Sequence, residues 1–156
     1  MKQLCFVFIL AILALSGCNS NAADQENEII YQRILKYSGK ELSKYKAVFI
    51  LPSQGCGNCI TNAETYFIEK YLPNKKHKLL YIITGLSSRK SAITRFGKDA
   101  VNSPDVHLDI NHNFDKPPFM VEYPKIVFLE NSKVSSISDI NPETSEKIYQ
   151  QIQLLN

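Results

Sequence analysis

The chain has 156 residues, of which 44% are hydrophobic and 21% charged, and its net charge is +3. These values are typical of one globular domain with a real core, and they exclude a chain that is disordered throughout. The positive charge is small and scattered, with no dense basic face interleaved with aromatic residues. It therefore gives no reason to expect nucleic acid as a partner.

The first 17 residues have the features of a secretory signal peptide. Met1-Lys2 gives a positive start, residues 4–15 are almost wholly apolar, and small residues follow in Ser16-Gly17. A basic start, an apolar run and a small-residue end are the three parts of an export signal. The apolar run is shorter than the roughly 20 residues that a transmembrane helix needs.

Leu15-Ser16-Gly17-Cys18 resembles the lipobox of bacterial lipoproteins. The resemblance implies that Cys18 carries a diacylglycerol and becomes the mature N-terminus; a plain signal peptide with a chance cysteine is the alternative. Residues 18–27 are then a polar, flexible tether that leads from the lipid to a domain formed by residues 28–156. Asn19, where an aspartate often marks inner-membrane retention, favours the outer membrane if the host is Gram-negative.

The rest of the chain alternates between helical and extended patterns. Helices are expected where apolar residues recur every three or four positions, and strands where short apolar or alternating runs end at turn residues. The predicted elements in order are a helix over 28–37, a strand over 46–52, a helix over 58–71, a strand over 78–84, a helix from Ser87 or Ser88 to Phe96, a short strand over 106–110, a hairpin over 125–129 and 133–138, and a last helix that starts at Asn141-Pro142-Glu143. This order predicts an α/β fold with helices on both faces of a sheet.

Only two of the four cysteines remain for chemistry in the mature domain. Cys5 lies in the signal peptide and Cys18 is expected to be acylated, which leaves Cys56 and Cys59. A Cys-x-x-Cys pair is either redox-active or half of a zinc site. A structural zinc site normally takes four nitrogen or sulfur ligands, and the three histidines are scattered along the chain. The sequence therefore predicts a dithiol and neither a metal nor another cofactor.

Cys56-Gly57-Asn58-Cys59 stands where the loop after a buried strand turns into a helix. A helix N-terminus offers unpaired backbone N–H groups and a partial positive charge, and such settings lower a thiol pKa from about 8.5 to roughly 3.5–7.5. Cys56 is thus the expected nucleophile. Cys59 lies one helical turn further on and can resolve a mixed disulfide, while Gly57 lets a partner's backbone approach closely.

This motif, the order of elements and Tyr123-Pro124 before a strand together resemble the thioredoxin superfamily. The chain is most similar to membrane-tethered, extracytoplasmic members of bacteria, over residues 46–155. The resemblance implies a thioredoxin-like fold with a central mixed sheet. It also implies that Pro124 is cis and lies beside the dithiol, that Tyr123 offers backbone hydrogen bonds to a substrate, and that Gly57 and Asn58 belong to the same docking surface.

The chain departs from that family at three points. Gly55 stands where many members have tryptophan, the strand over 46–51 lacks the buried acid that accepts a proton in thioredoxin, and Gly57-Asn58 replaces Gly-Pro. The predicted activity is thiol–disulfide exchange with exported proteins, aided by an upstream redox partner. The alternatives are a structural Cys56–Cys59 disulfide, a non-catalytic binding module at the membrane surface, and a Cu(I) carrier that adds His107 or His112 to the thiols.

Overall fold

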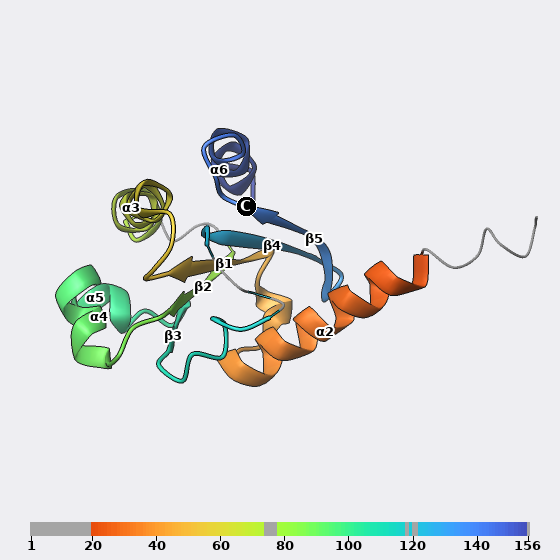
Figure 1. Cartoon of the computed structure of the whole chain (residues 1–156), viewed down its shortest axis with the longest axis horizontal. Coiled ribbons are helices and arrows are strands. Elements are labelled where there is room, and N and C mark those ends of the chain that lie inside the picture. Colours follow the sequence, from red (N-terminus) through yellow and green to blue (C-terminus); the bar gives the residue numbers. More distant parts are fainter. Residues whose placement is uncertain (1–19, 74–77, 118, 120–121, 156) are drawn as a thin grey trace, which may run out of the picture.

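The computed structural model describes residues 20–73, 78–117, 119 and 122–155. Its centre is a five-stranded mixed sheet with the strand order β3-β2-β1-β4-β5 (Figure 1). The strands are β1 (Ala47–Pro52), β2 (Leu79–Thr84), β3 (Val106–Asp109), β4 (Lys125–Glu130) and β5 (Lys133–Asp139). Neighbours β1, β2 and β3 run parallel, whereas β4 is antiparallel to both β1 and β5. The predicted α/β class and its thioredoxin-like arrangement are confirmed.

Most helices cover one face of this sheet. They are α3 (Gly57–Thr65) with its π-helical extension η2 (Tyr66–Tyr71), α4 (Arg89–Phe96), α5 (Lys98–Val101) and α6 (Ser145–Gln153). The steps from β1 to β2 and from β2 to β3 go the same way across the sheet. Because crossovers between parallel strands are right-handed, the helices of both steps must lie on the same face. Their buried side chains accordingly share one core cluster with α6.

The opposite face is covered by α2 (Ser20–Ser38) and by the segment that follows β3. Figure 1 shows α2 across the sheet from α3 and α6. Ile30 and Ile34 of α2 share a core cluster with Phe114 and Phe119 of that segment and with Leu42 of the short helix η1 (Leu42–Lys44). The chain has to pass from edge strand β3 across β2 and β1 to reach β4. The segment after β3 does this on the face of the sheet that the crossover helices do not cover.

Strands β1 and β2 are buried along their whole length, which explains their nearly continuous apolar sequences. Their side chains alternate between the two core clusters, so that Phe49 points toward α3 and Val48 toward α2. A strand buried on both faces needs no polar positions. These two strands therefore hold the sheet's centre rigid, and the dithiol loop leaves from the end of β1.

Four boundaries differ from the sequence-based expectation. Helix α2 starts at Ser20, because Ala22, Ala23 and Glu26 are good helix formers that extend the docked part of the helix through the expected tether. The helix after the dithiol becomes π-helical at Tyr66, with Leu72 N–H bonded to the carbonyl of Phe67.

At the other two boundaries, the local backbone conformation determines where the helix ends or begins. Gly97, with φ of 87°, ends α4 and lets the chain begin the additional helix α5. The last helix starts at Ser145, later than expected. The side chain of Asn141 accepts the N–H groups of Glu143 and Thr144, which makes a turn out of residues 142–144 before the helix begins.

Packing of α2 on the sheet can be tested with two neighbouring residues of that helix. Ile34 is fully buried, whereas the side chain of Leu35 is 37% exposed. We expect Ile34→Ala to lower the free energy of unfolding by about 2–4 kcal/mol, because it leaves a cavity in the core. Leu35→Ala should cost less than about 1 kcal/mol. Urea denaturation of both variants measures the difference, and equal losses would show that α2 is not docked as described.

Two buried tyrosines beneath α3 make a second matched pair. The Tyr71 hydroxyl donates to the carbonyl of Leu79 at 3.0 Å, but the buried Tyr81 hydroxyl has no hydrogen-bond partner among the described residues. Tyr71→Phe should therefore cost about 1 kcal/mol of stability, while Tyr81→Phe should be neutral or stabilising. Thermal or urea unfolding of the two variants gives the answer; a larger loss for Tyr81→Phe would contradict this account.

Candidate functional site

The two mature cysteines meet at the start of α3 and form a disulfide, with their Cα atoms 5.3 Å apart. Cys56 caps the N-terminus of the helix and Cys59 follows in its first turn. Cys56 is partly exposed, whereas Cys59 is only 6% exposed. Of the two cysteines, Cys56 is therefore the more accessible to an incoming disulfide.

Helix α3 supplies the electrostatic setting of the outer cysteine. Cys56 has extended backbone geometry, and its carbonyl accepts the N–H of Ile60 at 2.9 Å, which closes the first helical turn. The N–H groups inside that turn have no intrahelical acceptor, and together with the helix dipole they favour negative charge at this end. Helix α3 therefore places partial positive charge beside Cys56.

A backbone contact joins the dithiol loop to the segment before β4. The N–H of Cys56 donates to the carbonyl oxygen of Glu122 at 2.8 Å. Gly55 has a φ of 130°, and a Cβ atom at this position would overlap the same carbonyl. Glycine therefore stands where many relatives of thioredoxin have tryptophan, because the neighbouring segment occupies the space of any side chain.

The same contact brings the predicted docking residues near the dithiol. Tyr123 is half-buried and Pro124 is buried, directly between Glu122 and the start of β4. The carbonyl of Pro124 accepts the N–H of Ile140, which ties the segment to the end of β5. Gly57 and Asn58 are exposed in the first turn of α3. The cis form of Pro124 and the docking roles of these four residues stay predictions.

A small cavity of about 60 Å³ lies beside the inner cysteine. Its lining in the described part of the chain is Asn58, Cys59, Asn62, Ile140, Asn141, Pro142, Ser145 and Tyr149. Apart from Cys59, these residues offer amides, hydroxyls and apolar groups, and none of them is a carboxylate. The buried acid of thioredoxin lies in the strand before the dithiol, and the corresponding strand here, β1, is wholly apolar. Burial, with a smaller effect of Tyr66, raises the pKa of Tyr149 to about 12, so its hydroxyl keeps its proton at neutral pH. The cavity has room for a water molecule.

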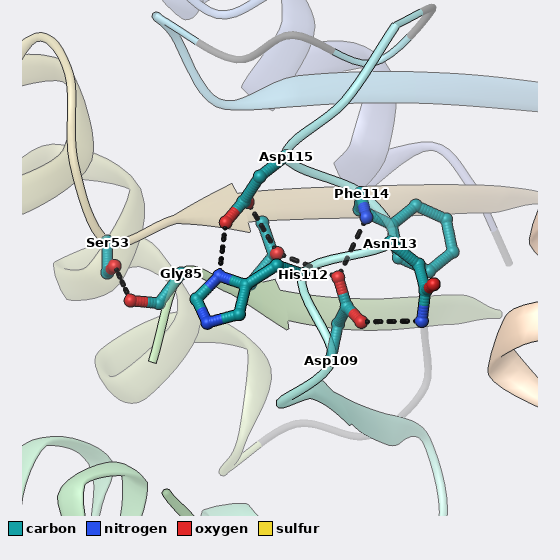
Figure 2. A network of polar contacts seen from close by, with 8 residues as sticks. Ser53, Gly85, Asp109, His112, Asn113, Phe114 and Asp115 are labelled. Carbon is teal, nitrogen blue, oxygen red and sulfur yellow. Dashed lines mark hydrogen bonds and ion pairs between the residues drawn. The ribbon is translucent and has the colours of Figure 1, made fainter. Parts of the chain in front are cut away.

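The buried carboxylate of the structure lies elsewhere, at the end of β3. Asp109 is 2% exposed and accepts hydrogen bonds from the amide of Asn113 and from the backbone N–H of Phe114. The Thr84 hydroxyl at the end of β2 lies 2.8 Å from a carboxylate oxygen of Asp109 and 2.6 Å from one of Asp115. Figure 2 labels both aspartates. The sequence showed Asp109 in the strand, but nothing in it indicated the partnership with Thr84 and Asp115.

His112 completes this cluster, with its Nδ1 2.7 Å from a carboxylate oxygen of Asp115. The two line a cavity of about 280 Å³ together with Pro52, Ser53, Gln54 and Gly85. The Ser53 hydroxyl donates to the carbonyl of Gly85 and joins the ends of β1 and β2 (Figure 2). This polar cavity adjoins the loop that leads into Cys56.

His107, the other histidine considered for the Cu(I) alternative, lies on a strand and not in the polar cavity. His107 lies on β3 beside Ile82 of β2, and burial lowers its pKa, although Asp109 partly opposes the shift. Within residues 20–73, 78–117, 119 and 122–155, no three His, Cys, Asp or Glu side chains gather so as to hold a metal ion.

The predicted signal peptide and lipid attachment at Cys18 lie outside the described residues. In the part of the chain that the structure covers, no helix is both long and apolar enough to span a bilayer.

Comparison with known proteins adds no relative: no protein-family model matches the chain, and no curated protein matches it either. The thioredoxin-like assignment therefore depends on the sheet topology and on the position of the disulfide.

The close approach of Gly55 to the Glu122 carbonyl predicts that three glycine-to-alanine substitutions differ in their cost to stability. Gly55→Ala combines a positive φ with overlap against a backbone carbonyl, and should cost more than about 3 kcal/mol of stability. Gly97→Ala has a positive φ in open space and should cost about 1–2 kcal/mol. Gly57→Ala has neither problem and should be neutral or slightly stabilising. Urea denaturation ranks the three, and a mild Gly55→Ala would contradict this close approach.

Proposed function

We propose that this protein is a thiol–disulfide oxidoreductase that exchanges disulfides with exported proteins. The observation that carries the proposal is the Cys56–Cys59 pair at the N-terminus of α3, with Cys56 partly exposed and Cys59 buried. A purely structural disulfide has no need of a partly exposed cysteine at a helix N-terminus. A bridge that closes so short a loop also contributes less to stability than a long-range one in the loop-entropy model.

The exchange proceeds in two steps. In the reduced protein, the Cys56 thiolate attacks one sulfur of a substrate disulfide, forms a mixed disulfide and releases the other substrate sulfur as a thiolate. Cys59 then loses its proton to water in the adjacent cavity and attacks Cys56. The Cys56–Cys59 disulfide forms, the second substrate thiolate leaves, and the substrate has gained two electrons. The same steps in reverse oxidise a substrate dithiol.

Direction in the cell follows from reduction potentials, since a difference of about 30 mV changes the equilibrium constant tenfold. An upstream redox partner that resets the pair belongs to the proposal. So does the location: the lipobox-like residues before Cys18 support a lipid anchor that keeps the domain at the extracytoplasmic face of a bacterial membrane. The chain between Cys18 and the docked part of α2 would then connect the lipid to the catalytic domain.

The cysteines can be separated by their roles in an insulin-reduction assay driven by dithiothreitol. We expect Cys56→Ser to abolish the stimulation, because no nucleophile remains, and Cys59→Ser to accumulate a mixed disulfide that non-reducing electrophoresis and mass spectrometry detect. Thr61→Ala, an exposed change in the same helix, is the matched control and should keep full activity.

Full activity in Cys56→Ser would overturn the proposal. If wild type shows no reduction and the Cys56→Ser/Cys59→Ser variant still performs the protein's biological role, the domain is a non-catalytic binding module instead.

A further inference from the structure

The polar cavity at the carboxyl ends of β1 and β2 lies next to the dithiol along the chain. Ser53 and Gln54 line it, and Gln54 precedes Cys56 by two residues. Two residues span at most about 7 Å, so the cavity opens within one or two residues of any chain docked across Cys56. The cavity also lies at the carboxyl ends of two neighbouring parallel strands, the edge of an open α/β sheet outside which ligands commonly bind.

One acidic residue, Asp115, lines the cavity, and it has no lysine or arginine partner among the described residues. Asp109 does not line the cavity but is linked to Asp115, because the Thr84 hydroxyl lies within hydrogen-bond distance of both carboxylates. Figure 2 labels the two aspartates. Among the residues that the structure describes, the ion pairs of these carboxylates include only His112, which is charged only when protonated. The Asp115 side chain is 30% exposed, so an occupant of the cavity can contact its charge. The cavity therefore favours a positively charged occupant.

The cluster is also one hydrogen-bond donor short. The Thr84 hydroxyl lies within bonding distance of a carboxylate oxygen of Asp109 and of one of Asp115, yet it carries a single proton. It can donate to only one of them at a time. Asp109 has two other donors, in Asn113 and Phe114, whereas Asp115 has only His112 besides Thr84. An occupant that donates hydrogen bonds to Asp115 would complete the network.

The size and preformed walls of the cavity further limit which groups can occupy it. At about 280 Å³ it is at the lower limit of pockets that take small molecules, and it suits one side chain. The Ser53–Gly85 hydrogen bond and the Asp109 contacts fix its walls before anything binds. A preformed site costs little ordering when it is filled.

We propose that this cavity is a specificity subsite that takes a lysine or arginine side chain of the substrate, close in sequence to the cysteine that Cys56 attacks. An ammonium group offers three hydrogen-bond donors and a guanidinium group offers five. Both are positively charged and can form an ion pair with Asp115. This inference rests on the proposed thiol–disulfide exchange and adds a substrate class to it: exported proteins whose disulfide has a basic neighbour.

Peptide substrates that differ in one side chain test the subsite. Each peptide holds the same intramolecular disulfide, with lysine, norleucine or glutamate placed one, two or three residues from either cysteine. For at least one position we expect kcat/KM to be roughly fivefold to tenfold higher for lysine than for norleucine, and lowest for glutamate. The preference should weaken as sodium chloride is raised, because the pair is partly exposed.

Variants of the protein identify the side chain responsible for the preference for lysine. Asp115→Asn keeps the shape and should bring the lysine-to-norleucine ratio to about one, whereas Asp99→Asn, an exposed change on α5, should leave the ratio as in wild type. Gln54→Lys places a cation at the exposed rim of the cavity and should also remove the preference. Since Gln54 is exposed, this variant keeps the test valid if circular dichroism shows that Asp115→Asn does not fold.

Equal rates for lysine, norleucine and glutamate peptides at every position would overturn the subsite and leave thiol–disulfide exchange intact. A lysine preference that survives both Asp115→Asn and Gln54→Lys would place basic recognition elsewhere and would also overturn it. If wild type reduces none of the peptides and no insulin, the proposed function itself is wrong, and the substrate subsite is rejected with it.

Discussion

One backbone hydrogen bond holds the proposed site together: the N–H of Cys56 donates to the carbonyl of Glu122. It fixes the start of α3 against the segment before β4, two parts of the chain that the sequence separates widely. The bond needs the two backbones to approach closely, and only a glycine at position 55, with its positive φ and no side chain, permits that approach. The missing tryptophan is therefore a consequence of this packing.

The connection from β3 to β4 carries most of what distinguishes this site. It crosses the face that α3, α4, α5 and α6 leave free, and Phe114 and Phe119 anchor it in the core beneath α2. With those anchors in place, His112 and Asp115 face the cavity beside the dithiol loop, and Glu122 reaches Cys56. One connection thus supplies both the polar cavity and the segment that leads into Pro124. Helix α2 supports the site indirectly, because it covers the anchors.

The sequence predicted the elements with local signals and missed those that depend on packing. The continuous apolar runs of β1 and β2 and the Ser88 and Gly97 limits of α4 were visible, because strand burial and helix capping are written in neighbouring residues. The dithiol position followed from the strand before it and the helix after it. By contrast, the contact between Gly55 and Glu122 and the partnership of Thr84 with Asp109 and Asp115 join distant residues, and no local pattern encodes them. The extent of α2 and the start of α6 were wrong where good helix formers or an Asn141 turn outweighed the apolar pattern.

Carboxylates and sulfur occupy different sides of the site, and this separation has a chemical consequence. A carboxylate beside Cys59 would accept its proton, but its charge would also oppose a thiolate nearby. Here the cavity beside Cys59 is lined by amides and hydroxyls, and the acids stand at the ends of β2 and β3, on the side of the Ser53–Gln54 loop. Under the proposed mechanism, Cys59 gives its proton to water, while the acidic groups are free to contact a substrate. On that proposal, α3 and the cavity beside Cys59 act on the dithiol, and the connection from β3 to β4 acts on substrate choice.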